Sequence, residues 1–363
     1  MRKRTITQTL TGTWAGDSPG IATDIDRTGY ITRISAVAEV VPSATLAGAN
    51  QPDGAWRIVQ NLRIVGGEHT YMNLPADDAA MGGTLLHYMN LLDGFGTGHS
   101  ILTIVAPNRT YTPITFTLHP GSRPRDLYGR DNKFDLTAFI PALREGQLRA
   151  EWVTSGNDVM DDTVTITSAV MRYTLHMVQG SPGEIREEMA RQQVVLPPGV
   201  PNGMVPAWTG EVFNHTAAAA DYSVERDIPP GGFLKRICIA EQDTTATRSL
   251  RAADEVTGIA VKLAEDGTDI FKAYTDFLTG NMPPGSSFLE AADAALDGGV
   301  HNAMGLYFVD LRPHAKSNHD YGLDLRGQKT GAVKLGLTIT AYAAGDDSLI
   351  LYERYLPNKM AEL

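Results

Sequence analysis

Cysteine, positive charge and long apolar runs are all scarce in this sequence. Its single cysteine, Cys238, excludes a disulfide within the chain and argues against a zinc site built from thiolates. The net charge of -11 argues against a surface that wraps duplex DNA, because such a surface neutralises phosphates with lysine and arginine. No apolar run approaches the roughly 18 residues of a membrane span, and the basic start leads into polar residues rather than a signal core. We therefore expect a soluble chain that is made in a cytoplasm and has no specific nucleic-acid binding.

Strand patterns separated by turns make up most of what is present. Residues 163–178 are rich in β-branched side chains, and residues 331–342 alternate between apolar and polar positions. Helical patterns are few and cover residues 77–92, 182–195 and 269–278. These proportions predict an all-β chain with short helices in its loops and its linker.

A linker composition divides the chain near its middle. Residues 196–206 read LPPGVPNGMVP, with four prolines and two glycines. They follow the helical stretch that begins at Pro182. With 363 residues and roughly 150 residues for a typical domain, the chain is long enough for two domains of nearly equal size.

One short strand pattern occurs in both halves. Residues 29–40 read GYITRISAVAEV, and residues 231–242 read GGFLKRICIAEQ. In each stretch a glycine precedes an aromatic residue, an arginine and an isoleucine follow, and the stretch ends in small and aliphatic residues before a glutamate. A duplicated domain would explain why one chain contains the same strand twice.

Further short patterns recur in the same order in the two halves. Each half has a leucine two residues before a proline, then a Tyr-Gly pair eight residues after that proline, then an Asp-Leu pair. The matched segments are 118–120 with 311–313, 128–129 with 321–322, and 135–136 with 324–325. Their common order favours two copies of one β-sandwich with about eight strands each.

This order resembles that of the double jelly-roll major capsid proteins of tailless icosahedral viruses with an internal membrane. The resemblance implies two successive jelly rolls, a homotrimer of pseudo-hexagonal outline, and assembly into a viral shell. Neighbouring trimers, minor capsid proteins and the internal membrane of the virion are then the expected partners, and the virion capsid is the expected location. The expected parts are an N-terminal arm (1–25), a first roll (26–181), a helical and Pro-rich linker (182–206) and a second roll (207–363).

The N-terminal arm carries the densest basic cluster, Arg2, Lys3 and Arg4. By the resemblance, these residues are candidates for contact with a membrane or with a neighbouring subunit. The family transfers no catalytic, cofactor-binding or metal-binding residues, so none is expected, and we expect no enzyme.

Several motifs that suggest chemistry are better explained as turns and loops. Residues 16–20 match the Gly-x-Ser-x-Gly pattern, but Pro19 lacks the N–H that an oxyanion hole needs after the serine. The glycines of residues 94–98 are wrongly spaced for a phosphate-binding loop.

Clusters of other reactive or aromatic side chains are interpreted in the same way. His314, His319, Asp320 and Asp324 match no metal spacing that we would accept, and the pairs Asp77-Asp78 and Asp161-Asp162 suit turns and helix starts. Trp56, Trp152 and Trp208 could form a sugar platform, but Trp152 alternates with apolar residues as a core position does.

Two other functions therefore stay open beside the shell protein. One is a β-sandwich spike protein that binds carbohydrate or a receptor, and the other is an enzyme on a jelly-roll scaffold, because a fold alone does not fix a function.

Overall fold

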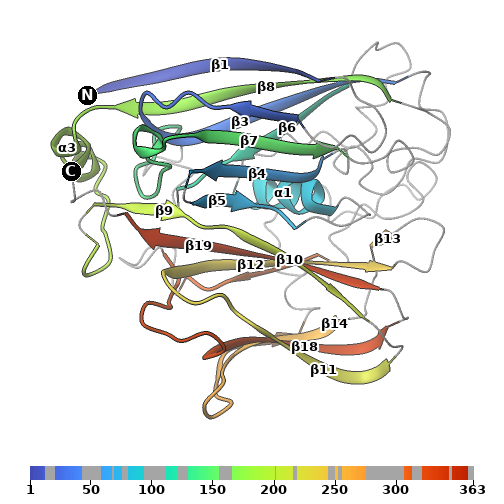
Figure 1. Cartoon of the computed structure of the whole chain (residues 1–363). Coiled ribbons are helices and arrows are strands. Elements are labelled where there is room, and N and C mark those ends of the chain that lie inside the picture. Colours follow the sequence, from blue (N-terminus) through green and yellow to red (C-terminus); the bar gives the residue numbers. More distant parts are fainter. Residues whose placement is uncertain are drawn as a thin grey trace.

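The chain forms two β-sandwiches, one above the other in Figure 1. This computed structural model describes residues 1–12, 21–42, 59–67, 69–75, 81–93, 112–121, 130–154, 166–200, 202–215, 219–243, 250–251, 256–274, 306–312, 321–342 and 346–358.

The upper sandwich, which we call roll 1, consists of two four-stranded antiparallel sheets. The first has the order β1 (Arg2–Gly12), β8 (Ile166–Gln179), β3 (Tyr30–Pro42) and β6 (Thr112–Leu118). The second has the order β2 (Ile21–Asp24), β7 (Leu148–Thr154), β4 (Val59–Gly66) and β5 (Thr70–Asn73).

The lower sandwich, roll 2, is built in the same way. Its first sheet contains β10 (Thr209–Asn214), β19 (Asp347–Pro357), β12 (Phe233–Asp243) and β16 (Leu306–Asp310), with short additions at β9 (Met204–Pro206), β13 (Leu250–Arg251) and β17 (Leu323–Asp324). Its second sheet has the order β11 (Ala219–Asp227), β18 (Val333–Tyr342), β14 (Val256–Leu263) and β15 (Asp269–Tyr274).

The two rolls share one topology. If the eight main strands of each roll are counted along the chain, one sheet has the order first, eighth, third and sixth, and the other has the order second, seventh, fourth and fifth. This is the arrangement of a jelly roll. The predicted all-β fold with two successive jelly rolls is therefore confirmed.

The recurring stretches occupy equivalent strands and share an irregularity. β3 and β12 are both third strands, each paired with the last strand of its roll. Each contains a β-bulge at the same point, with Thr32 as the extra residue in β3 and Lys235 in β12. A bulge bends the strand and redirects the side chains around it. The prediction that these stretches lie at equivalent positions is correct.

In both stretches a backbone carbonyl oxygen lies so close to the glycine that no Cβ atom would fit. A Cβ atom on Gly29 would lie 2.8 Å from the oxygen of Val178, and one on Gly232 would lie 2.1 Å from the oxygen of Tyr355. Val178 and Tyr355 are the residues paired with the aromatic that follows each glycine. The Gly-aromatic pattern thus reflects one strand start that was built twice.

Helices are few in the described part of the chain, as expected, but one predicted helix is a strand. α1 (Met81–Leu92) and α3 (Pro182–Arg191) lie within predicted helical stretches. Ser181 and Glu184 form a capping box at the start of α3, which explains its well-defined N-terminus. A short 3-10 turn, η2 (Ala142–Arg144), precedes β7. Residues 269–274 were predicted as the start of a helix, but they form β15, because pairing with β14 outweighs their local preference.

The N-terminal segment is not an arm outside the sandwich. Residues 2–12 form β1, which pairs with β8 along its whole length, and residues 21–24 form β2, which pairs with β7. β1 is the first strand of roll 1, so removing it would expose the backbone of β8. Its polar sequence is explained by its place at a sheet edge, where few side chains enter the core.

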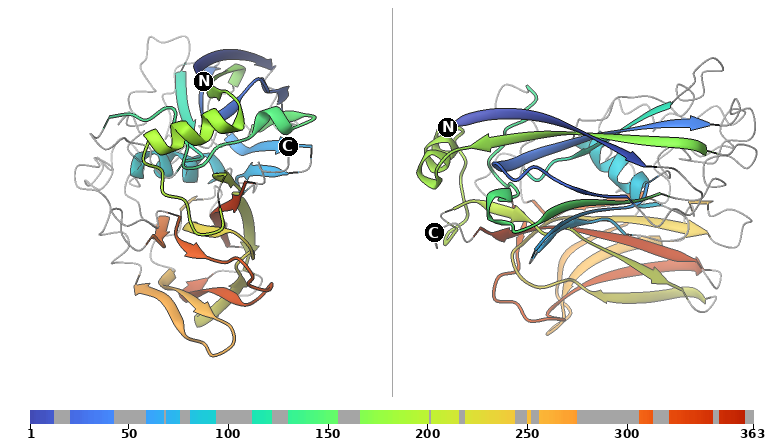
Figure 2. Two further views of the ribbon diagram at one scale, coloured as in Figure 1. Left: turned by 90° about the vertical axis from the view of Figure 1, so that its left-hand side faces the viewer. Right: turned by 45° about the horizontal axis from the view of Figure 1, so that its top comes forward.

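The linker after α3 contains no strand through Pro197 and Pro198, in line with their lack of a backbone N–H. Residues 204–206 are an exception, because β9 pairs with the end of β19. Figure 2 shows α3 at the end of the molecule where β1 begins. Met189 and Ile185 of α3 pack there against Phe139 and Tyr30, so the linker is fastened to roll 1.

Substitution of Gly232 by alanine tests the strand start. Gly232 has a φ of +71° and the 2.1 Å approach described above, so we expect Gly232→Ala to lower the free energy of unfolding by about 2 to 4 kcal/mol. Urea denaturation followed by circular dichroism measures this. Gly231→Ala is the matched control, because φ is +84° there but nothing lies within 4 Å of the new methyl group; we expect it to cost about 1 kcal/mol. Equal losses would show that the approach of the Tyr355 carbonyl does not matter.

Candidate functional site

The two rolls meet at a continuous apolar surface, which we call the roll junction. One side is the face of β12 and β19 that carries Cys238, Ala240, Leu349 and Leu351, all at 0% exposure. The other side is α1 with the strand β5 of roll 1. All of these residues belong to one core with side chains of roll 1, including Leu85, Leu86, Met89 and Tyr71, and with Trp208 at the start of roll 2. The junction therefore has the composition of a protein interior and is permanent.

Backbone hydrogen bonds cross the roll junction at Trp208, just before β10. The Trp208 N–H donates to the Tyr71 carbonyl oxygen at 3.0 Å, and the Trp208 carbonyl accepts from the Asn73 N–H at 3.1 Å. This pattern pairs the edge strand β5 with the chain of roll 2. A Cβ atom on the nearby Gly210 would lie 2.1 Å from the nitrogen of Pro75, so the two backbones are in close contact.

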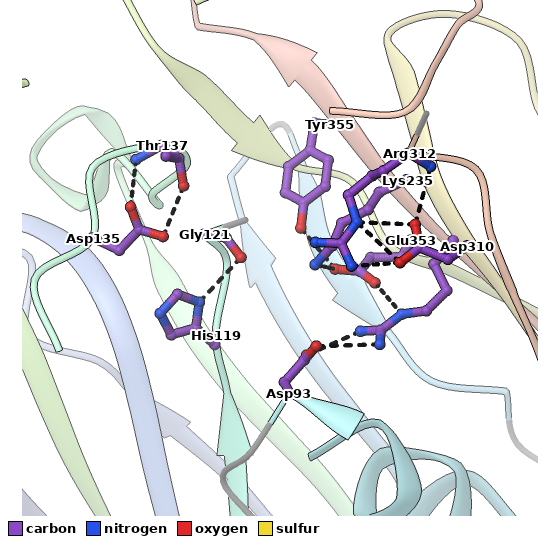
Figure 3. A network of polar contacts seen from close by, with 11 residues as sticks. Asp93, His119, Gly121, Asp135, Thr137, Lys235, Asp310, Arg312, Glu353 and Tyr355 are labelled. Atoms are coloured by element: carbon purple, nitrogen blue, oxygen red, sulfur yellow. Dashed lines mark hydrogen bonds and ion pairs between the residues drawn. The ribbon is translucent and has the colours of Figure 1, made fainter. Parts of the chain in front are cut away.

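An ionic network lies beside this apolar surface, around the carboxylate of Glu353 (Figure 3). Lys235 Nζ lies 2.8 Å from Oε1 and Arg236 Nε lies 2.8 Å from Oε2. The hydroxyl of Tyr355 donates to Oε1 at 2.7 Å. The bulge in β12 explains why two successive cations reach the same carboxylate, since the extra residue Lys235 breaks the alternation of side chains.

Arg236 connects this network to roll 1. Its NH1 and NH2 groups donate to the two carboxylate oxygens of Asp93, which follows α1, at 3.2 and 3.0 Å. Burial alone would raise the pKa of Glu353, but the charges of Arg236 and Lys235 outweigh it and hold that pKa below its ordinary range. The network is therefore ionised, and its hydrogen bonds fix how α1 meets β12.

A second polar group of roll 1 lies nearby and is also buried (Figure 3). Asp135 accepts from the N–H and the hydroxyl of Thr137 at 3.0 and 2.8 Å, and His119 contacts the Gly121 carbonyl at 3.1 Å. The hydroxyl of Tyr321 donates to the Thr137 carbonyl at 3.1 Å. Tyr321 of the recurring Tyr-Gly pair is thus a contact between the rolls, whereas its counterpart at 128–129 lies outside the described residues.

The equivalent face of roll 1 has a different character. By strand register, Ser35, Val37, Arg172 and Thr174 occupy the positions of Cys238, Ala240, Leu349 and Leu351. Arg172 is exposed and the other three are partly exposed. The same sheet face is therefore apolar and buried in roll 2, but polar and accessible in roll 1.

The next pair in the same register is also polar in both rolls. In roll 1 this pair is Arg33 and His176, and in roll 2 it is Arg236 and Glu353. Arg33 is 3% exposed and its NH1 lies 2.6 Å from Asp131 Oδ1. His176 is buried, and Thr5 Oγ1 lies 3.2 Å from its Nδ1. Both rolls thus use the arginine after the bulge to hold a loop against the sheet.

The predicted basic cluster lies at the start of β1 and is divided between the two sides of the strand. Lys3 Nζ lies 3.0 Å from Glu188 Oε1 on α3. Arg2 and Arg4 alternate with Lys3, are exposed, and form no ion pair with any residue that the structure describes. Lys3 is therefore on the α3 side of the strand, whereas Arg2 and Arg4 are on the other side.

The other candidates from the sequence give no reactive site. Trp152 is fully buried in the core and Trp208 is 3% exposed at the roll junction, so neither belongs to a sugar platform. Asp324 is 2.7 Å from Arg326 in an exposed ion pair. The remaining candidates lie outside the described residues: 16–20, 94–98, Trp56, Asp77, Asp78, Asp161, Asp162, His314, His319 and Asp320.

Two kinds of feature are absent from the described part of the chain. It contains no group of three His, Cys, Asp or Glu side chains placed to hold a metal ion. Nor does it contain a helix that is both long and apolar enough to cross a membrane.

Sequence reasoning missed the ionic network. The signal that could have indicated it is Lys235-Arg236 between Leu234 and Ile237, since two cations in an apolar strand require buried partners. Glu353 in the final strand was the corresponding anion. Asp93 could not have been paired with them, because nothing in the sequence places α1 against β12.

Comparison with solved structures shows likeness over nearly the whole chain. The crystal structure of the STIV MCP matches with a TM-score of 0.66 and 16% identity over 99% of both chains. A chain of the atomic structure of Sulfolobus Turreted Icosahedral Virus matches with a TM-score of 0.64 and 16% identity over 99% of this chain and 92% of that one. The major capsid protein of bacteriophage PM2 matches with a TM-score of 0.51 and 8% identity over 98% and 99%.

These likenesses show the double jelly-roll fold. No protein-family model matches the sequence, and no curated protein matches it.

Neutralising Glu353 tests the network. We expect Glu353→Gln to lower the free energy of unfolding by about 3 to 5 kcal/mol, because Lys235 and Arg236 would be left with excess positive charge in the interior. Asp324→Asn is the control, because it also removes a carboxylate from an ion pair, here with Arg326, but Asp324 is 47% exposed. We expect this variant to lose less than about 1 kcal/mol. Urea denaturation measures both. A loss at Glu353 as small as that at Asp324 would contradict the network's importance.

His176 should make stability depend on pH. Burial, aided by the charges of Arg33 and Lys133, lowers the pKa of His176 to about 4. Between an unfolded value of about 6.5 and this folded value, only the unfolded chain binds the proton, so stability should fall as pH is lowered through this window. The total effect should be up to about 3 kcal/mol.

In the matched experiment, denaturation is measured at several pH values between 4 and 7. We expect His176→Asn to flatten the pH dependence, whereas His69→Asn, at an exposed position, should leave it unchanged. An identical slope in the His176 variant and the parent protein would exclude this role.

Proposed function

We propose that this chain is the major capsid protein of an icosahedral virus and that its function is to assemble the viral shell. The observation that carries the proposal is the likeness of the whole chain, both rolls and their connection included, to structures named as viral major capsid proteins. Two rolls fixed to each other are the building unit of such a shell, and the roll junction is what fixes them.

The chemistry of the surfaces supports an assembling protein. The roll junction is apolar and fully buried, as expected of a permanent interface, whereas the equivalent face of roll 1 is polar and accessible. A shell must close by repeated contacts that can be corrected, and polar surfaces of moderate affinity suit this requirement. The chain thus has one permanent interface within itself and surfaces suited to reversible contacts.

The doubled roll supports a homotrimer. Three copies arranged head to tail around a threefold axis bring together six rolls of one topology, which gives a pseudo-hexagonal unit. Head-to-tail contacts of this kind close into a ring when the rotation between copies is one third of a turn. Neighbouring trimers, minor capsid proteins and a virion membrane are the further partners of the proposed shell.

Electron microscopy and sedimentation of the purified chain test the proposal. We expect particles of pseudo-hexagonal outline with about three times the mass of one 39.2 kDa chain, and closed shells at higher concentration. A spike protein would instead appear as elongated or single-chain particles, and a chain that stays monomeric at all concentrations would overturn the proposal.

A further inference from the structure

The roll junction has two sides, and each side has a counterpart that the described part of the chain leaves uncovered. On one side, the edge strand β5 of roll 1 bonds to Trp208 at the start of roll 2. The counterpart of β5 is β15, the edge strand of roll 2. The counterpart of the chain around Trp208 is β1, the edge strand of roll 1. Neither edge has a strand partner on its outer side within the described chain.

Strand register makes the equivalence of β15 and β5 specific. Val261 of β14 pairs with Phe271 of β15, and at the equivalent point of roll 1 Ile64 of β4 pairs with Met72 of β5. In β15 and in β5, the residue just before this pair is a bulge that has no partner in the ladder. The bulged residues are Tyr71 in β5 and Ile270 in β15. Tyr71 is 1% exposed, with its carbonyl bonded to Trp208 of roll 2 and its hydroxyl to Glu145 of roll 1. Ile270 is 39% exposed and is one of the few large apolar side chains on the surface of the described part of the chain. Ile270 is therefore uncovered where its counterpart is covered.

The same comparison identifies the receiving residues on β1. Thr7 pairs with Thr174 and Gly210 pairs with Leu351, and Thr174 and Leu351 occupy equivalent positions in the two rolls. Thr7 is therefore the counterpart of Gly210, and Thr5, two residues earlier, is the counterpart of Trp208. Thr5 is exposed. The strand β9, which contacts β5 within the chain, corresponds in the same register to residues 1–3. The basic start of β1 thus stands where roll 2 receives β5.

The charges of the two uncovered edges are complementary. Arg2 and Arg4 are exposed and unpaired among the described residues. Glu265 and Asp266 in the turn before β15, and Asp269 at its start, are exposed residues, and Asp269 lies 3.7 Å from Lys272 of the same strand. Acidic residues are also concentrated in roll 2: residues 207–363 contain 22 acidic and 14 basic residues, a net charge of -8, against 17 and 15, a net charge of -2, in residues 1–181.

We propose that the β15 edge of one copy docks on the β1 edge of a second copy and so repeats the roll junction between chains. In this contact Ile270 is covered, the backbone of β15 bonds to Thr5, and the carboxylates of Glu265, Asp266 and Asp269 face Arg2 and Arg4. The contact is head to tail, with different edges on its two sides. It rests on the proposed function, since it specifies the surfaces through which the copies of a trimer meet.

Charge reversal on each edge, followed by a charge swap, tests this contact. The first variant is Arg2→Glu with Arg4→Glu, the second is Glu265→Lys with Asp269→Lys, and the third combines all four changes. We expect each reversal to raise the dissociation constant of the trimer about tenfold or more, and the combined variant to recover most of that loss. Sedimentation velocity over a concentration series, at low and at high salt, measures the constants. Lys329→Glu, a reversal at another exposed position, is the control and should have no effect.

A second variant probes the apolar part of the same edge. Ile270→Ser should weaken the trimer about fivefold to tenfold at all salt concentrations, because it removes apolar contact rather than charge. Far-UV circular dichroism and the urea midpoint of each dissociated variant establish that the single chain is folded.

The possible results separate the contact from the function. Trimers that withstand both charge reversals and Ile270→Ser would overturn the proposed edges while leaving the shell protein intact. Folded reversal variants whose combination fails to recover would also overturn the pairing of these charges. A parent chain that forms neither trimers nor shells would overturn the proposed function itself.

Discussion

The carboxylate of Glu353 holds the centre of the molecule together. It lies at 1% exposure on β19 and receives Lys235 and Arg236 from β12, so it fixes the bulge that brings both cations to one side. Arg236 in turn reaches Asp93 beyond α1. An apolar cluster of similar volume could match such a network in stability, but its contacts lack the directional hydrogen bonds that Glu353 accepts. The directional bonds around Glu353 therefore define how the rolls sit on each other.

One scaffold carries two kinds of surface in this chain. The sheet that contains β12 and the sheet that contains β3 share topology, bulge and buried arginine. Their outer faces differ, because Leu349 and Leu351 of roll 2 are replaced in register by Arg172 and Thr174 of roll 1. The two rolls thus share one backbone shape, whereas their side chains determine that this sheet face is buried in roll 2 and accessible in roll 1.

Much of the fold could be predicted from the sequence, and the exceptions have physical reasons. β8 and β18 have β-branched or alternating patterns that give a strand wherever one face is buried. β1 was assigned to an arm, because an edge strand with a polar sequence gains its stability from the ladder with β8 rather than from its own apolar residues. β15 was assigned to a helix for the same reason, since its partner β14 is what makes it extended.

The site was less predictable than the fold. The basic cluster was found, but its division by strand alternation, with Lys3 bound to α3 and Arg2 and Arg4 free of ion pairs with described residues, needs the register of β1. The partners in the ionic network are separated by more than a hundred positions along the chain. Contacts of that separation leave no periodic trace in a single sequence.

The place of β19 in the sheet has a consequence for how the molecule is made. Among the described strands β19 comes last in the sequence, yet it lies between β10 and β12 and also pairs with β9. Until a ribosome has released it, β10 and β12 lack the neighbour that joins them, and Lys235 and Arg236 lack their anion. Roll 1 can close its own sheets well before that moment, since β8 ends at Gln179. Synthesis therefore leaves the apolar side of β12 uncovered until β19 has emerged, and apolar surface that is exposed for a time makes a nascent chain prone to aggregate.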